Sequence, residues 1–263
     1  MIIPIDDLKE WFYILSMGTP RIIALFTVLP ILHKRNLGGA MIRNGIAACL
    51  VLFMHPMLTE TYSGVEPTIY NTAGIVIKEA FIGGIIGFCL AIPYWALESA
   101  GFFIDNQRGA SSASILNPFS GAETSPMGIL FMQAVIALVM TSGLFLLMLE
   151  GIIISYKVWP VFSYFPQINL DATTFFLLQF DQIIQISMWL AAPVIICMFI
   201  SEFGLALISR AAPQLNVFIL AMPIKSAVAC AILVVYMDTI LALTRKKMMG
   251  LPQLLDSLGV IWK

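Results

Sequence analysis

The sequence predicts an all-α membrane protein, because apolar residues dominate it and charges are too few to cover a soluble surface. Hydrophobic residues make up 60% of the 263 residues and charged residues 11%, whereas an ordinary soluble domain carries roughly 25% charged residues. A soluble globule of this length would expose more surface than these charges can cover. Lipid or a large partner surface must therefore cover much of the chain. The net charge of −1 provides no basic footprint for nucleic acid.

Six apolar stretches are candidates for helices that cross a bilayer, which takes about 20 residues for a hydrocarbon core of roughly 30 Å. Strands are not expected, because open sheets cannot face lipid. No soluble domain or low-complexity linker separates the stretches, so we expect a single domain over residues 1–263. The stretches are Trp11–Leu32, Met41–Leu58, Thr72–Ala96, Met127–Leu149, Ile183–Ile208 and Val217–Leu243.

Prolines and charges interrupt these stretches. A proline inside a helix removes a hydrogen bond and kinks it, and a charge at a lipid-facing helix centre costs at least ~2.5–3.5 kcal/mol. Snorkelling towards the interface fits Arg210 and Asp238 better than Arg21 and Lys225, for which interior pairing or a subunit interface is favoured. Arg21, Glu202 and Lys225 have no evident partner within the chain. We predict that four charges lie at assembly interfaces, namely Arg21, Glu202, Arg210 and Lys225.

The positive-inside rule gives an inconsistent topology. Lys34, Arg35 and Arg43 place the connection after the first stretch in the cytoplasm, and Arg245–Lys247 place the segment after the sixth stretch there as well. Five stretches separate these two segments, but two segments on the same side of a membrane must be separated by an even number of crossings. Either one stretch is not a simple crossing or the rule is overridden, and kinked hairpins within a larger helical assembly would account for this.

Small residues in the third stretch predict close helix packing. Ala80 and Gly84 form one small-xxx-small pair, and Gly83 and Gly87 form another. Such pairs let two helix backbones approach closely in a membrane. They indicate packing and not a function.

The sequence contains no recognisable catalytic or metal-binding motif. The HExxH, GxSxG and P-loop patterns are absent, and the only histidines are His33 and His55, which adjoin different stretches. We therefore expect neither an enzyme nor a cofactor.

The segment from Gly101 to Phe131 is the most unusual part of the chain. Non-helical backbone at membrane depth must be buried in protein or line an aqueous path, and Asn117-Pro118 cannot continue a helix. An ordinary polar surface loop is the alternative, but small residues mixed with large apolar ones suit a plug. The predicted loop anchor is Asp105, Asn106, Gln107 and Arg108, and the predicted plug contains Ser111, Ile115, Leu116, Asn117, Pro118, Phe119 and Gly121.

Several strings of the sequence are specific enough to indicate a family. They include Arg43-Asn44-Gly45, Pro93–Gly101, Asp105–Ala110, Glu202-Phe203-Gly204 and Met222–Ser226. Through them the chain resembles the SctT family of type III secretion export proteins, which includes YscT, SpaR and the flagellar FliR. The resemblance covers essentially the whole chain. The absence of a Gly-His pair after the fourth stretch, where Thr141-Ser142-Gly143 stands, favours the injectisome branch over flagellar export.

The resemblance implies a structural subunit of an export gate in the bacterial inner membrane. Members of the family join SctR and SctS subunits in one assembly, which unfolded secreted proteins traverse, and they contact the SctU switch protein near the SctV ring. The loop after the third stretch is then a pore plug. The alternative to a structural pore subunit is a self-contained secondary transporter of small solutes, because transporters also have broken helices and charges near the middle of the membrane. A transporter would usually show paired repeats, and here the repeat signal is faint.

Overall fold

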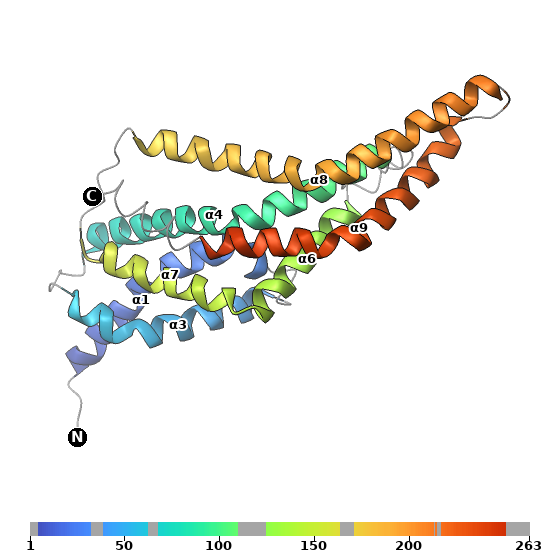
Figure 1. Ribbon diagram of the computed structural model, residues 1–263. Coiled ribbons are helices and arrows are strands. Elements are labelled where there is room, and N and C mark those ends of the chain that lie inside the picture. The colour runs from blue at the N-terminus through green and yellow to red at the C-terminus, as the bar shows by residue number, and fades with distance from the viewer. Residues whose placement is uncertain are drawn as a thin grey trace. The chain divides into compact units, whose positions relative to one another are not determined.

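The computed structural model describes residues 5–32, 39–62, 68–109, 125–163, 171–212, 214 and 217–250. Within these ranges the chain is helical and contains no strand, which confirms the all-α prediction. The elements, shown in Figure 1, are α1 (Ile5–Val28), the short 3₁₀ helix η1 (Pro30–Leu32), α3 (Ala40–Glu60), α4 (Ile69–Arg108), α6 (Pro126–Thr141), α7 (Leu144–Val158), α8 (Asp171–Ala211) and α9 (Val217–Met249).

Five of these helices are long and apolar enough to span a membrane, namely α1, α3, α4, α8 and α9. The prediction of about six apolar helical segments is confirmed, with a difference in the fourth. Met127–Leu149 is not one helix, because α6 ends at Thr141 and α7 begins at Leu144, and the axis bends by 77° at the break. Gly143 has a φ of 75°, a left-handed conformation that glycine adopts without a Cβ penalty.

Two helices are longer than the sequence predicts. The third stretch was expected to end at Ala96, but α4 continues to Arg108 and covers 40 residues. The fifth was expected to begin at Ile183, but α8 begins at Asp171 and covers 41 residues. At 1.5 Å per residue each helix is about 60 Å long, roughly twice the thickness of a bilayer core.

The chain forms two compact units, and α4 and α8 contribute to both. Unit 1 contains α1, α3, the part of α4 up to Ala91, α7 and the first turn of α8. In this unit α1 and α3 lie side by side (Figure 1). Its core is built from buried apolar side chains at helical spacing, such as Ile22, Leu25 and Phe26 of α1 and Val51, Met54 and Leu58 of α3.

Unit 2 contains α4 from Ile92, α6, most of α8 and α9 up to Met248. Its α6 buries one face at helical spacing, through Gly128, Phe131, Val135 and Val139. The later part of α8 and the start of α9 run alongside each other as a hairpin (Figure 1). The single domain expected over residues 1–263 stays a prediction.

Candidate functional site

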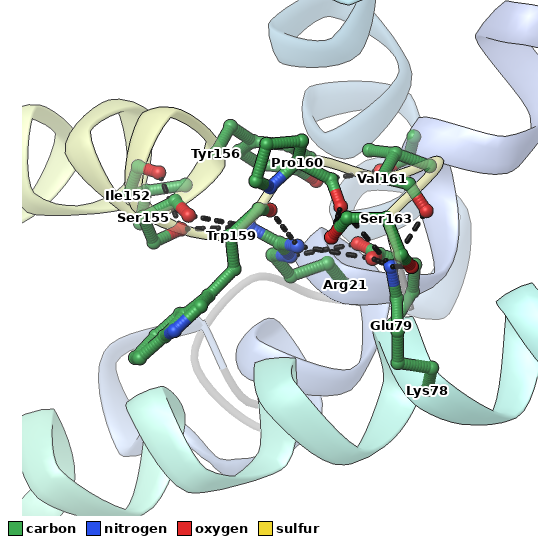
Figure 2. Close-up of polar contacts among 11 residues, drawn as sticks. Arg21, Lys78, Glu79, Ile152, Ser155, Tyr156, Trp159, Pro160, Val161 and Ser163 are labelled. Atoms are coloured by element: carbon green, nitrogen blue, oxygen red, sulfur yellow. Dashed lines mark hydrogen bonds and ion pairs between the residues drawn. The ribbon is translucent and has the colours of Figure 1, made fainter. Parts of the chain in front are cut away.

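Three charged side chains are buried together in unit 1. Arg21 of α1 and Glu79 of α4 are both fully buried, and Lys78 is only 4% exposed. Arg21 Nε lies 2.7 Å from Glu79 Oε2, Arg21 Nη2 lies 3.0 Å from Glu79 Oε1, and Lys78 Nζ lies 3.1 Å from Glu79 Oε1. The guanidinium thus binds the carboxylate with two parallel hydrogen bonds, a geometry that lysine cannot provide. We call Arg21, Lys78 and Glu79 the Arg21 cluster (Figure 2).

The remaining donors of the cluster bind the end of α7 and the residues after it (Figure 2). Arg21 Nη1 donates to the carbonyl oxygen of Ser155 over 2.8 Å, and Arg21 Nη2 donates to that of Trp159 over 2.7 Å. The last carbonyls of a helix have no partner within it and carry a partial negative charge. The Ser155 carbonyl already accepts from the backbone N–H of Trp159, so the guanidinium is its second donor, and it also binds the carbonyl of the C-cap residue Trp159. Lys78 Nζ makes three further bonds of this kind, to the carbonyl oxygens of Pro160, Val161 and Ser163.

Tyr156 completes the contact between α1 and α7. The Arg21 guanidinium carbon lies 4.1 Å from the centre of the Tyr156 ring, which places a cation over the aromatic face. The Tyr156 hydroxyl donates to the carbonyl oxygen of Gly18 over 2.6 Å. The cluster thereby ties α1, α4 and the end of α7 together in unit 1.

The expectation that Arg21 lacks a partner within the chain is wrong. Its partners, Glu79, Ser155 and Trp159, are 58 to 138 residues away in the sequence. Lys78 and Glu79 stand out in the sequence as adjacent charges within an apolar stretch, which is the signal that could have indicated this pairing. The α7 carbonyls could not have been found in this way, since every residue carries a carbonyl.

Two glycines of α4 allow α1 to approach the cluster. A Cβ atom added at Gly83 would overlap the backbone of Arg21, and one added at Gly87 would lie 3.0 Å from the carbonyl oxygen of Leu25. A Cβ at Gly84 would have no heavy atom within 4 Å. Of the two small-residue pairs in this stretch, Gly83 and Gly87 therefore face α1.

In unit 2, Asp105 joins the end of α4 to the start of α6. Its Oδ2 accepts hydrogen bonds from Ser125 Oγ over 2.6 Å and from the backbone N–H of Met127 over 3.0 Å. Ser125 is the N-cap of α6 and accepts from the backbone N–H of Gly128. Arg108 Nε lies 2.8 Å from Asp105 Oδ1. A carboxylate at a helix N-terminus is stabilised by the free N–H groups there.

The segment between these two helices contains every predicted plug residue. Ser111, Ile115, Leu116, Asn117, Pro118, Phe119 and Gly121 lie outside the described residues. Asp105 and Arg108 lie where the segment leaves α4, and Ser125 lies where it returns. Asn106 is exposed and Gln107 is partly exposed at the end of α4. The plug and its anchor stay predictions.

The other three predicted interface charges lie in the hairpin of α8 and α9. Lys225 Nζ donates to Glu202 Oε2 over 3.0 Å, so the expectation that these two residues lack a partner is also wrong. The Lys225 side chain is 11% exposed, whereas that of Glu202 is 44% exposed. Arg210 is exposed near the end of α8. The pair holds α8 and α9 together, and the open side of Glu202 and the Arg210 guanidinium are accessible from outside the chain.

None of these three polar sites is arranged like a known catalytic centre. The carboxylates, amines and hydroxyls described above are engaged with other groups of the chain. Among the described residues, no three His, Cys, Asp or Glu side chains gather at a distance that would suit a metal ion. The geometry therefore supports a role in positioning helices.

Comparison with known proteins relates most of the chain to one family. The model of the family described as bacterial export proteins, family 1, matches residues 12–251. Yop proteins translocation protein T of Yersinia pestis is 47% identical over 231 residues, which cover 88% of each chain. Secretion system apparatus protein SsaT of Salmonella typhimurium is 34% identical over 229 residues, covering 84% of this chain and 85% of the relative. Flagellar biosynthetic protein FliR of Bacillus subtilis is 29% identical over 226 residues, covering 86% of each. The chain therefore belongs to family 1 of the bacterial export proteins, the SctT, SpaR and FliR family that its sequence resembles.

Proposed function

We propose that this multi-pass membrane protein is a structural, non-enzymatic subunit of a type III secretion export apparatus in the bacterial inner membrane. In this proposal it joins SctR-like and SctS-like subunits around the pore that unfolded proteins cross. The identity of 47% to a Yersinia translocation protein, against 29% to a flagellar protein, supports the injectisome branch. The SctU-like switch protein and the SctV-like ring would lie next to this assembly.

The apolar surface of α8 carries the proposal that the chain is one subunit of a larger assembly. Exposed large apolar side chains continue along this helix from Leu177 to Ile208. At 1.5 Å per residue they extend over about 46 Å, whereas a bilayer core is roughly 30 Å thick. Lipid alone therefore leaves part of this surface in contact with water, and a protein partner would cover the rest.

The neighbouring helix α9 supports the same conclusion. Only 22% of the most apolar 18-residue window of α9 is buried within the chain, whereas 56% of the corresponding window of α4 is buried. Val234 and Val235 of α9 are more than four-fifths exposed. The partly exposed Glu202 and the exposed Arg210 lie in the same hairpin, where charges of a partner subunit could pair with them.

The positive-inside conflict is resolved if the broken pair α6 and α7 enters and leaves the membrane on one side. Four spanning helices, α3, α4, α8 and α9, then separate the first connection from the basic end of α9. Four is an even number, so both basic segments lie on the cytoplasmic face as the rule requires.

The test is to express the chain alone and together with the SctR-like and SctS-like subunits of the same bacterium, and to analyse detergent extracts by native mass spectrometry. We expect the lone chain to aggregate, because the apolar faces of α8 and α9 have no partner. We expect the co-expressed chain to be detected in one complex with both subunits. Co-expression with an unrelated multi-pass protein is the control. A monodisperse lone chain that binds neither subunit would contradict the proposal.

A further inference from the structure

A groove between α3 and α7 in unit 1 has no role in the contacts described above. It has a volume of about 370 Å³. Its apolar lining includes Leu50, Phe53 and Met54 from α3 and Leu149 and Ile153 from α7, and two charged residues of α7, Glu150 and Lys157, also line it. Phe53 is 75% exposed. The groove is therefore open to a molecule outside the chain.

Glu150 is out of place on this surface if lipid covers it. It lies in the middle of α7 between Leu149 and Ile152–Ile154, and it is exposed. Neither Glu150 nor Lys157 takes part in an ion pair among the residues that the structure describes. A carboxylate within an apolar helix is costly towards lipid and typically pairs with a cation.

The two charges define what can occupy the groove. Glu150 and Lys157 are seven residues apart, so they lie on the same face of α7 and about 10 Å from each other along the axis. A complementary occupant carries a cation and an anion about two helical turns apart, with apolar surface between them. A second apolar helix with one basic and one acidic residue has this pattern. A phospholipid headgroup does not, because its amine and phosphate are adjacent and lie at the membrane surface.

We propose that this groove binds an apolar helix of a partner subunit, which brings a Lys or Arg to Glu150 and an Asp or Glu to Lys157. The inference rests on the proposed function, since it requires that the chain be part of a multi-subunit assembly. It goes further by assigning an interface to α3 and α7, in addition to the exposed hairpin of α8 and α9, and by specifying the charges of the helix that docks there.

The test uses the co-expressed assembly with the photo-crosslinker benzoylphenylalanine in place of Phe53. The matched control carries it in place of Tyr70, an aromatic residue of α4 that is 86% exposed and does not line the groove. We expect the Phe53 probe to crosslink to one apolar helix of a partner subunit, which mass spectrometry identifies. The Tyr70 probe should not crosslink to that helix.

The charge pattern is tested in the same assembly. Glu150→Lys should lower the crosslink yield at Phe53 by about tenfold or more, equivalent to about 1.4 kcal/mol. Replacing the facing Lys or Arg of the crosslinked helix by Glu should restore the yield. Glu60→Lys, at the exposed end of α3, is the control and should leave the yield unchanged.

Three results would overturn the inference while leaving the proposed function intact, provided that the partner subunits still co-purify. The first is a phospholipid adduct at Phe53 with no protein adduct. The second is full labelling of Phe53→Cys in the assembly by a water-soluble thiol reagent. The third is a protein crosslink whose yield does not respond to Glu150→Lys. Failure of the unaltered chain to co-purify with any subunit would instead contradict the proposed function itself.

Discussion

The Arg21 cluster carries a net charge of +1 in a site where all three residues are at least 96% buried. Removing charges from water is costly, and a buried pair is tolerated only if every donor and acceptor finds a partner. Here the carboxylate of Glu79 neutralises one cation, and five carbonyl oxygens at and beyond the end of α7 receive the remaining donors. Glu79 is the one anion of the cluster, so its loss should matter more than the loss of either cation.

We predict that Glu79→Gln destabilises the protein more than Arg21→Gln. Glu79→Gln leaves two buried cations next to each other, whereas Arg21→Gln leaves Lys78 paired with Glu79. Loss of one partner of a buried pair costs on the order of 3–5 kcal/mol. The measurement is the temperature at which half of the chain in detergent extracts of the co-expressed assembly aggregates. Asp7→Asn, an exposed change in α1, should have almost no effect, and the opposite order of the two buried variants would refute this account.

At the scale of elements, α4 makes a close contact with one further helix in each unit. Its Gly83 and Gly87 admit α1 in unit 1, and its Asp105 binds the N-terminus of α6 in unit 2. A Cβ added at Gly101 would overlap the backbone of Gly128, so α6 also approaches α4 closely. Close backbone approach at small residues is the usual means of packing helices in a membrane.

Gly83→Ala should weaken the packing of α1 on α4, and Gly84→Ala should not. The added methyl group at Gly83 meets backbone atoms of Arg21, which cannot rotate away, so the two helices must separate. At Gly84 the same change meets open space, and alanine favours a helix over glycine by up to about 1 kcal/mol. The same aggregation assay measures both. Equal loss of stability from the two variants would show that the Gly83 contact does not hold α1 in place.

For the whole molecule, two groups of charges differ in their surroundings. Those of the Arg21 cluster are satisfied within one unit and are hidden from any partner. Those of Glu202, Arg210, Glu150 and Lys157 are partly or fully exposed on apolar helices and remain available to other subunits. In the proposed assembly the first kind would maintain the fold of the chain, and the second would select its neighbours.

The predicted plug concerns the whole assembly. Replacing Ile115, Leu116 and Phe119 by Gly should leave the complex assembled but make it leak, because a hydrophobic constriction excludes water and ions. Membrane conductance in cells that express the gate subunits reports the leak. The matched control replaces Ser112, Ser114 and Ser120 by Gly, which also adds three glycines but removes no large apolar side chain. A triple variant that assembles and stays as tight as the parent would rule out the plug.

The sequence alone determined the class, the helices and the presence of unusual charges. Composition and long apolar stretches are local properties, and they predicted an all-α membrane protein with six apolar stretches. Five of these correspond to the spanning helices, and the sixth, Met127–Leu149, is the broken pair α6 and α7. The helix ends were less predictable. α4 continues through Asp105 and Arg108, where Asp105 binds both Arg108 and the N-terminus of α6, and the backbone N–H that it binds there is 22 residues away in the sequence.

Only the tertiary structure decided which charges are paired. Arg21 and Glu79 are 58 residues apart, and Arg21 and Trp159 are 138 apart, so no spacing rule connects them. The interpretation that Arg21 and Lys225 need interior pairing or a subunit interface was correct in its premise, since buried charge must be neutralised, and the structure gives each of them a partner within the chain. The local sequence shows that a charge in an apolar helix has a high free energy unless it is paired. The group that pairs with it is determined by packing between helices that are distant in the sequence, and this packing cannot be read from a single sequence.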